Sequence, residues 1–211
     1  MQEKKLFTIL NTIADWIIRV IMINLLVITF MLPVVTIIPA ITAGYKLFSD
    51  YLNKDEENLF KGFFKYFKEA FVNKMIVTII LILVIGVTYY NNRQYGTLIE
   101  SNSNILYTIG YYLTLVILIG VIMITMYLPL VFSERSKYDI GKSFKLAFYL
   151  SGKYVFRTVA LTLTLLIPYL MFTTNFTILL FVFCGVSIVL LLNALITKKP
   201  RKYLQEMEGK L

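Results

Sequence analysis

The stretch FMLPVVTIIPAITAGY, residues 30–45, decides how the first apolar segment of this chain ends, because it holds two prolines six positions apart. Proline lacks a backbone N–H and breaks a helix, whereas backbone polar groups that face lipid must all be paired. Pro33 lies roughly 25 Å along a helix that begins near Trp16, close to the thickness of a bilayer core. We therefore expect Pro33 to end or kink the first membrane span near its cytoplasmic edge. Pro39 would then stand in the first turn of a new helix, where a missing N–H costs nothing.

Two other interpretations of this stretch stay open. It could form a re-entrant turn, which would leave both ends of the first segment on one side of the membrane. It could also be a broken transmembrane helix of the kind that opens backbone groups onto a substrate site in transporters.

The composition assigns the chain to the membrane proteins. Its 211 residues are 58% hydrophobic and 16% charged, with a mean hydropathy of +0.75. Soluble domains are roughly 45–50% apolar and about 25% charged. Several almost uncharged runs are long enough to cross a bilayer as helices. The predicted fold class is an all-α membrane protein, formed as one integral membrane domain over residues 1–211.

The apolar runs predict five transmembrane helices, joined in part by amphipathic helices that lie at the cytoplasmic membrane surface. The spans are expected at about residues 16–38, 74–90, 105–132, 156–172 and 176–196. The short connection Thr173–Asn175 makes the last two a tight helical hairpin. The interfacial helices are expected at about residues 39–53, 55–71 and 139–154. Along residues 39–53, Lys46 and Asp50 would face away from the apolar side.

The distribution of Lys and Arg predicts the orientation. Basic residues gather in the first and third connections and in the C-terminal tail, whereas the second connection carries only Arg93. The positive-inside rule then places those connections and the C-terminus in the cytoplasm of a multi-pass cell-membrane protein. An odd number of spans would put the N-terminus outside. Lys4, Lys5 and Arg19 oppose that placement, and a re-entrant first segment would remove the conflict.

The residue inventory argues against several classes of function. The net charge of +9 fits orientation and contact with lipid headgroups, and no motif indicates a nucleic-acid partner. The chain has no histidine and one cysteine, Cys184, so histidine-based metal sites and CxxC redox pairs are excluded. Residues 75–92, 105–132 and 158–197 contain no Asp, Glu, Lys or Arg, which argues against a proton-relay transporter. We predict no catalytic residue, no cofactor and no metal, and hence no enzyme.

Neutral polar and amphipathic residues remain as candidates. Asn24 is expected to form hydrogen bonds to a neighbouring helix, and Asp139 to cap the helix at 139–154. The two amphipathic segments 55–71 and 139–154 could anchor the chain at the membrane or dock a cytoplasmic partner. The proposed docking residues are Phe60, Phe64, Lys65, Lys68, Phe144, Lys145 and Phe148.

Several motifs resemble the YesL-like family of small bacterial integral membrane proteins, whose function is unknown. They are Asn24-Leu25-Leu26, Leu32-Pro33-Val34-Val35-Thr36-Ile37 with Pro39, and Phe60-Lys61-Gly62-Phe63-Phe64 continuing to Asn73. The motif residues singled out, with no role assigned, are Asn24, Leu32, Pro33, Thr36, Pro39, Gly62, Phe63, Phe64 and Asn73.

The resemblance implies an accessory or regulatory role in carbohydrate uptake, because members of this family tend to be encoded beside carbohydrate transporters and glycan-degrading enzymes. The expected partners are the lipid bilayer and subunits of a carbohydrate transporter or sensor, and a homo-oligomer is left open. The alternative function is a permease for an uncharged sugar or another small neutral solute.

Overall fold

The computed structural model describes residues 2–55, 57–101, 104–137 and 139–208, which are helical almost throughout, with no strand among them. The elements, with η1 a 3₁₀-helix and η2 a π-helix, are α1 (Gln2–Met31), η1 (Val34–Thr36), α2 (Ile37–Leu52), α3 (Leu59–Lys68), α4 (Phe71–Ser101), α5 (Ile105–Glu134), α6 (Ile140–Lys153), α7 (Val155–Thr164), α8 (Leu166–Met171), α9 (Asn175–Leu180), η2 (Phe181–Gly185), α10 (Val186–Ile196) and α11 (Lys198–Glu208).

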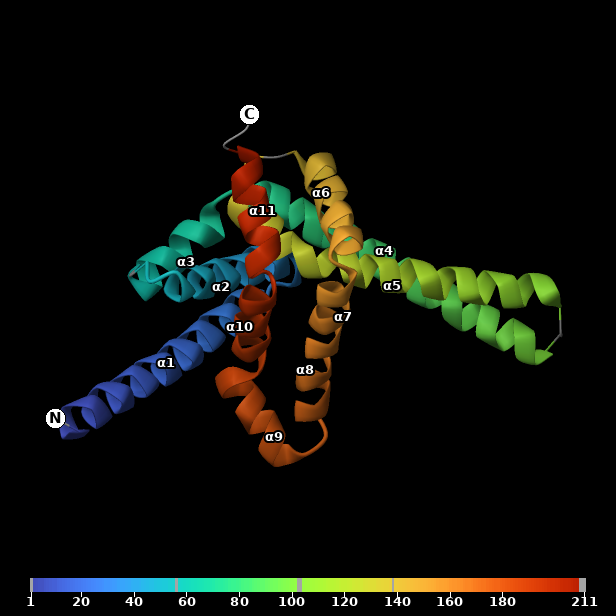
Figure 1. Ribbon diagram of the computed structural model, residues 1–211. Coiled ribbons are helices and arrows are strands. Elements are labelled where there is room, and N and C mark those ends of the chain that lie inside the picture. Colours follow the sequence, from blue (N-terminus) through green and yellow to red (C-terminus); the bar gives the residue numbers. More distant parts are fainter. Residues whose placement is uncertain (1, 56, 102–103, 138, 209–211) are drawn as a thin grey trace.

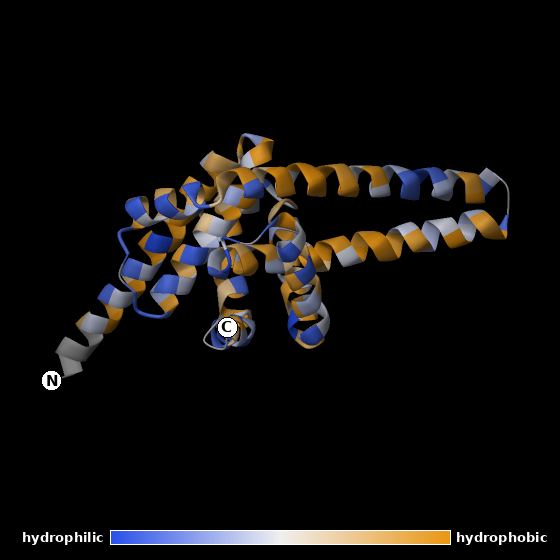
Figure 2. Cartoon of the chain, turned by 90° about the horizontal axis from the view of Figure 1, so that it is seen from above, coloured by the Kyte–Doolittle hydropathy of each residue, from blue (hydrophilic) through white to orange (hydrophobic). Residues whose placement is uncertain are grey.

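Three groups of helices diverge from a common junction. The hairpin of α4 and α5 projects to one side, α1 projects to the other, and the hairpin from α7 to α10 points downward (Figure 1). The view from above keeps α1 and the α4–α5 hairpin on opposite sides and shows the hairpin as largely hydrophobic (Figure 2). The junction itself is formed by α2, α3 and the adjoining ends of the longer helices.

Four helical stretches of the described chain are long and apolar enough to cross a membrane. They are Phe7–Met31, Phe71–Ser101, Ile105–Glu134 and Asn175–Ile196. A fifth crossing is counted if α6 and the pair α7–α8 are taken as one broken span, although the chain bends by 103° between them. Membrane location is therefore supported by four or five apolar helices.

The opening stretch forms a corner. α1 ends at Met31, before Pro33, and Pro39 lies in the first turn of α2, both as predicted. The Thr36 hydroxyl lies 2.6 Å from the carbonyl oxygens of Phe30 and Pro33, so it donates to a carbonyl freed where α1 ends. At the start of α2, the Ile38 N–H donates to Thr78 Oγ1 of α4 (3.3 Å). The Thr36 hydroxyl and the Ile38 N–H are thus paired within the protein, which favours a structural corner over a substrate-binding break.

Helix α2 is the centre of the molecule. It contacts α1, α3, α4, α5 and α10, and most of its side chains are buried. It runs antiparallel to α1, and the two backbones approach closely at Gly44. A Cβ atom there would lie 2.7 Å from Val27 Cγ2 and 2.8 Å from Leu190 Cδ1. The predicted polar side of this helix is turned inward, because Lys46 and Asp50 find partners in the core.

The hairpin of α4 and α5 meets the rest of the molecule only near its base. Burial is concentrated in the first third of α4, around Val77, and in the last third of α5, around Phe132. We call residues 82–101 and 104–120 the arm. Within the arm, Asn92 Nδ2 donates to Tyr111 O (3.2 Å) and Thr114 Oγ1 (3.1 Å), which joins the two helices. Most of its large apolar side chains are exposed.

Candidate functional site

Four charged side chains form a network at the junction, two cations and two anions from three helices. Lys46 and Asp50 lie one turn apart on α2, Glu134 is the last residue of α5, and Arg201 lies in the first turns of α11. The four side chains are only 6–19% exposed. Two positive and two negative charges balance, which is the condition for keeping such groups out of water.

Glu134 is the best-connected member of the network. Its Oε1 accepts from Arg201 Nε (2.8 Å) and from Lys46 Nζ (3.4 Å), and its Oε2 accepts from Gln205 Nε2 (3.0 Å). Arg201 also donates to the hydroxyl and the carbonyl oxygen of Ser49. Asp50 Oδ1 lies 3.6 Å from Arg201 Nη2 and 3.7 Å from Lys46 Nζ. The network therefore fastens the C-terminal helix α11 to α2 and to the end of α5.

The network is polar but is not built like a metal site. Asp50 and Glu134 are both paired with cations, and the described residues contain no group of three or more His, Cys, Asp and Glu that could hold a metal ion. Asp50 Oδ2 has no hydrogen-bond partner. Removing one partner from such a network leaves a buried charge uncompensated, so the four residues depend on one another.

Asn24 makes the interhelical hydrogen bonds that were predicted for it. It is fully buried, and its Nδ2 donates to the carbonyl oxygens of Phe181 (3.1 Å) and Val182 (2.6 Å). Its Oδ1 accepts from the Ser187 N–H (2.8 Å). These three backbone groups lie where the π-helix η2 meets its α-helical neighbours, and such a change of geometry leaves backbone groups in need of partners. Asn24 thus holds the irregular turn of the C-terminal hairpin against α1.

The other motif residues gather around the corner and α3. Pro39 and Phe63 are buried, and a Cβ atom on the buried Gly62 would lie 2.9 Å from Leu47 Cδ2. Phe30 packs against Phe63, Phe64 and Phe67 with ring centroids 5.1–5.6 Å apart. Leu32 is 75% exposed, Pro33 is exposed, and Asn73 is half-buried at the start of α4. The buried motif residues therefore serve the packing of α1, α2 and α3.

The proposed docking residues of α3 lie partly on its outer face. Phe60 and Phe64 are 49% and 38% exposed, and Lys65 and Lys68 are exposed. Lys65 Nζ donates to Glu57 Oε1 (2.9 Å), and this hydrogen bond holds the pKa of the Glu57 carboxyl below its ordinary value. The inner face, with Gly62, Phe63 and Tyr66, packs toward α2.

The docking residues of α6 are divided between the two faces of that helix. Phe148 is 68% exposed and Lys145 is exposed, whereas Phe144 packs in part against the core. Asp139 caps the helix as predicted, with Oδ1 accepting from the Ile140 N–H (2.7 Å). α6 packs on α5 and α7 and α3 packs on α2, so the two faces lie on different sides of α11 (Figure 1).

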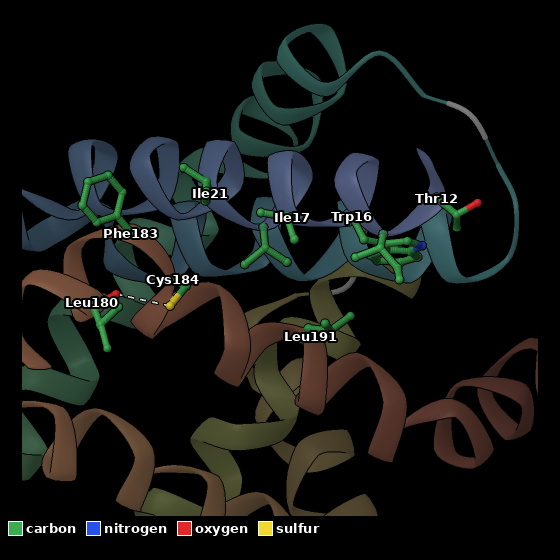
Figure 3. A pocket seen from close by; sticks show the side chains of 10 residues that line it. Thr12, Trp16, Ile17, Ile21, Leu180, Phe183, Cys184 and Leu191 are labelled. Atoms are coloured by element: carbon green, nitrogen blue, oxygen red, sulfur yellow. Dashed lines mark hydrogen bonds between the residues drawn. The ribbon is translucent and has the colours of Figure 1, made fainter. Parts of the chain in front are cut away.

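Two cavities lie among the apolar helices. An open groove of about 640 Å³ runs between α1 and the segment from α9 to α10, and Trp16, Ile17, Cys184 and Leu191 are among its lining residues (Figure 3). A smaller cavity of about 190 Å³ lies between α2, α5, α8 and α10, next to Pro129 and Pro168, and only Asn193 and Thr125 among its lining residues are polar.

Sequence reasoning missed the network. Lys46 and Asp50 were expected on an exposed side, and Glu134 and Arg201 were not singled out. The signal that could have found them is an acidic residue at the very end of a long apolar run, since such a charge needs a partner. Which basic residue of the tail pairs with Glu134 depends on the tertiary fold, so Arg201 could not be identified from the sequence.

Comparison with known proteins relates part of the chain to a protein family. Residues 20–92 match a family described as "Protein of unknown function, DUF624". The matched region contains most of α1, the corner, α2, α3 and most of α4, and all the motif residues from Asn24 to Asn73 fall inside it. No curated protein and no solved structure matches the chain.

Proposed function

We propose that this chain is a non-enzymatic, multi-pass protein of the cell membrane that acts as an accessory or regulatory component of a carbohydrate uptake system. Its proposed partners are subunits of a carbohydrate transporter or a sensor. The resemblance to the YesL-like family supports the link with carbohydrate uptake. The basic first and third connections and tail support a cytoplasmic position for the junction and the C-terminus.

The observation that carries this proposal is the arm. Its two helices contact each other, and their outer faces are left exposed by the rest of the described chain, with Leu83 61% and Val116 64% exposed. In a bilayer such faces meet either lipid or other transmembrane helices. An arm that extends from a well-packed junction is well suited to reach a neighbouring membrane protein, while the exposed faces of α3 and α6 remain available for cytoplasmic contacts.

Site-specific photocrosslinking in native membranes tests the proposal. A photoreactive amino acid at Val116 in the arm should give adducts with a transporter subunit or a sensor. The matched control is Leu179 on α9, which is similarly exposed (55%) but lies outside the arm. Adducts at neither position, together with repeated purification of the protein alone, would argue against an accessory role.

The alternative is a permease for a small neutral solute, and the cavity beside Pro129 and Pro168 is the observation in its favour. Asn193 Nδ2 donates to Met126 O (3.2 Å), and its buried Oδ1 has no hydrogen-bond partner. However, two polar side chains offer few partners for the many hydroxyls of a sugar. Proteoliposome uptake of labelled oligosaccharides should distinguish the two functions. Uptake by the unchanged protein that is lost in Asn193→Leu would support the permease.

A further inference from the structure

A basic pocket lies between the end of α2 and the start of α11. It has a volume of about 390 Å³, and its polar lining consists of Ser49, Asn53, Lys198, Arg201, Lys202 and Gln205. The charged residues all come from the first turns of α11, and Leu52 and Ala194 form its apolar side.

The two lysines supply positive charge that the protein does not balance. The charge of Arg201 is compensated in the ion-pair network by Asp50 and Glu134. Lys202 Nζ lies 3.9 Å from Glu206 Oε1, with both side chains largely exposed, so this pair is weak. Among the described residues no carboxylate lies within ion-pair distance of Lys198. The pocket therefore suits an anion with several acceptor oxygens.

The apolar groove between α1 and α10 begins close to this pocket. Leu191 lines the groove and Ala194 lines the pocket, one turn apart on α10. Trp16 and Leu191 lie toward one end of the groove, and Ile21 and Phe183 toward the other (Figure 3). The Arg19 guanidinium lies 5.9 Å from the Trp16 ring and 4.3 Å from the Tyr51 ring, which brings this part of α1 to the end of α2.

We propose that the pocket and the groove together bind one anionic phospholipid. Its phosphate would lie between Lys198 and Lys202, and an acyl chain would follow the groove from Leu191 toward Phe183. Basic pockets at the cytoplasmic ends of transmembrane helices bind anionic headgroups, and tryptophan is enriched at the membrane boundary where the headgroup would lie. An apolar groove next to a basic pocket fits a lipid better than a soluble anion. This site goes beyond the accessory role and does not depend on which partner binds the arm.

Lipid binding to the purified full-length protein tests this site. The protein in detergent is titrated with phosphatidylglycerol or with phosphatidylcholine, and bound lipid is measured by native mass spectrometry. We expect phosphatidylglycerol to bind more tightly. The double variant Lys198→Gln/Lys202→Gln should weaken its binding roughly 30-fold, about fivefold per lysine. Lys137→Gln/Lys142→Gln removes the same charge from exposed positions just before and within α6 and should leave binding unchanged.

Two further experiments distinguish the contribution of the groove from that of the pocket. Ile17→Trp fills the groove and should reduce the binding of both lipids, whereas Val159→Trp on α7, at a similarly exposed position, should not. Inorganic phosphate alone should raise the melting temperature much less than phosphatidylglycerol does. Equal stabilisation by phosphate would identify a site for soluble anions and overturn the proposal, as would equal effects of the two lysine pairs.

Discussion

Helix α2 and the arm show opposite relations between composition and burial. α2 carries Lys46 and Asp50 and is the most enclosed helix of the molecule, whereas the middle of α4 and α5 carries only uncharged, mainly apolar residues and is mostly exposed. In water the reverse would hold. In a membrane, lipid solvates apolar side chains and the protein interior must satisfy polar ones. Of these two regions, the one that carries charged side chains is therefore the buried one.

The largest expected effect is on the network around α2. Arg201→Ala would leave Glu134 and Asp50 with Lys46 as their only cationic partner among the described residues. Breaking a buried pair costs about 3–5 kcal/mol. The free energy of unfolding in detergent should fall by that amount, and α11 should become sensitive to protease. Lys202→Ala, on the exposed side of the same helix, is the control. Equal stability of the two variants would mean that the network does not hold the junction.

A charge placed on the arm tests the other side of the comparison. Leu83→Lys puts an ammonium group near the middle of an apolar stretch, which costs about 2.5–3.5 kcal/mol in translocon-mediated insertion. The insertion efficiency of α4, measured with a glycosylation reporter, should fall accordingly. Phe60→Lys on α3, which is also exposed (49%) but lies outside every candidate span, should have little effect on insertion. Tolerance at position 83 would indicate that the arm lies in water.

Glycine substitutions compare packing in the two regions directly. Gly44→Val would overlap Val27 and Leu190, and overpacking of this kind costs about 1–3 kcal/mol. Gly86→Val in the arm meets nothing within 4 Å and should be neutral. Thermal unfolding in detergent measures both changes. A stability loss at Gly86 and none at Gly44 would contradict the close approach of α1, α2 and α10.

The smallest effect is expected just beyond α2. Lys54 has a φ of 66°, in the left-handed region that glycine adopts more readily than other residues. Lys54→Gly should therefore raise the free energy of unfolding by about 0.5–1 kcal/mol. Lys54→Ala removes the same side chain without relieving the backbone, so it separates strain from charge. If Lys54→Ala stabilises as much as Lys54→Gly, the gain comes from the charge.

Local features were predictable from the sequence because local chemistry determines them. The end of α1 before Pro33, the position of Pro39, the Asp139 cap and the bonding role of Asn24 all follow from residue type and spacing. The burial of α2 could not be predicted in this way, because the partners of Lys46 and Asp50 are Glu134 and Arg201, far along the chain. An amphipathic pattern does not show whether its polar side faces water or other charged residues.

The contact between Arg19 and Tyr51 bears on how many times the chain crosses the membrane. α1 passes the end of α2 at Arg19, so residues 2–18 remain beyond it, roughly 26 Å of helix, and their apolar part begins only at Phe7. If the junction lies on the cytoplasmic side, as proposed, this remainder is too short for a bilayer core of about 30 Å. α1 and α2 would then enter and leave on one side, the crossings would be even in number, and both termini would face the cytoplasm. Cysteines introduced at positions 5 and 93 distinguish an even from an odd number of crossings. Labelling from outside the cell at position 93 alone indicates an even number of crossings, and labelling at both positions indicates five.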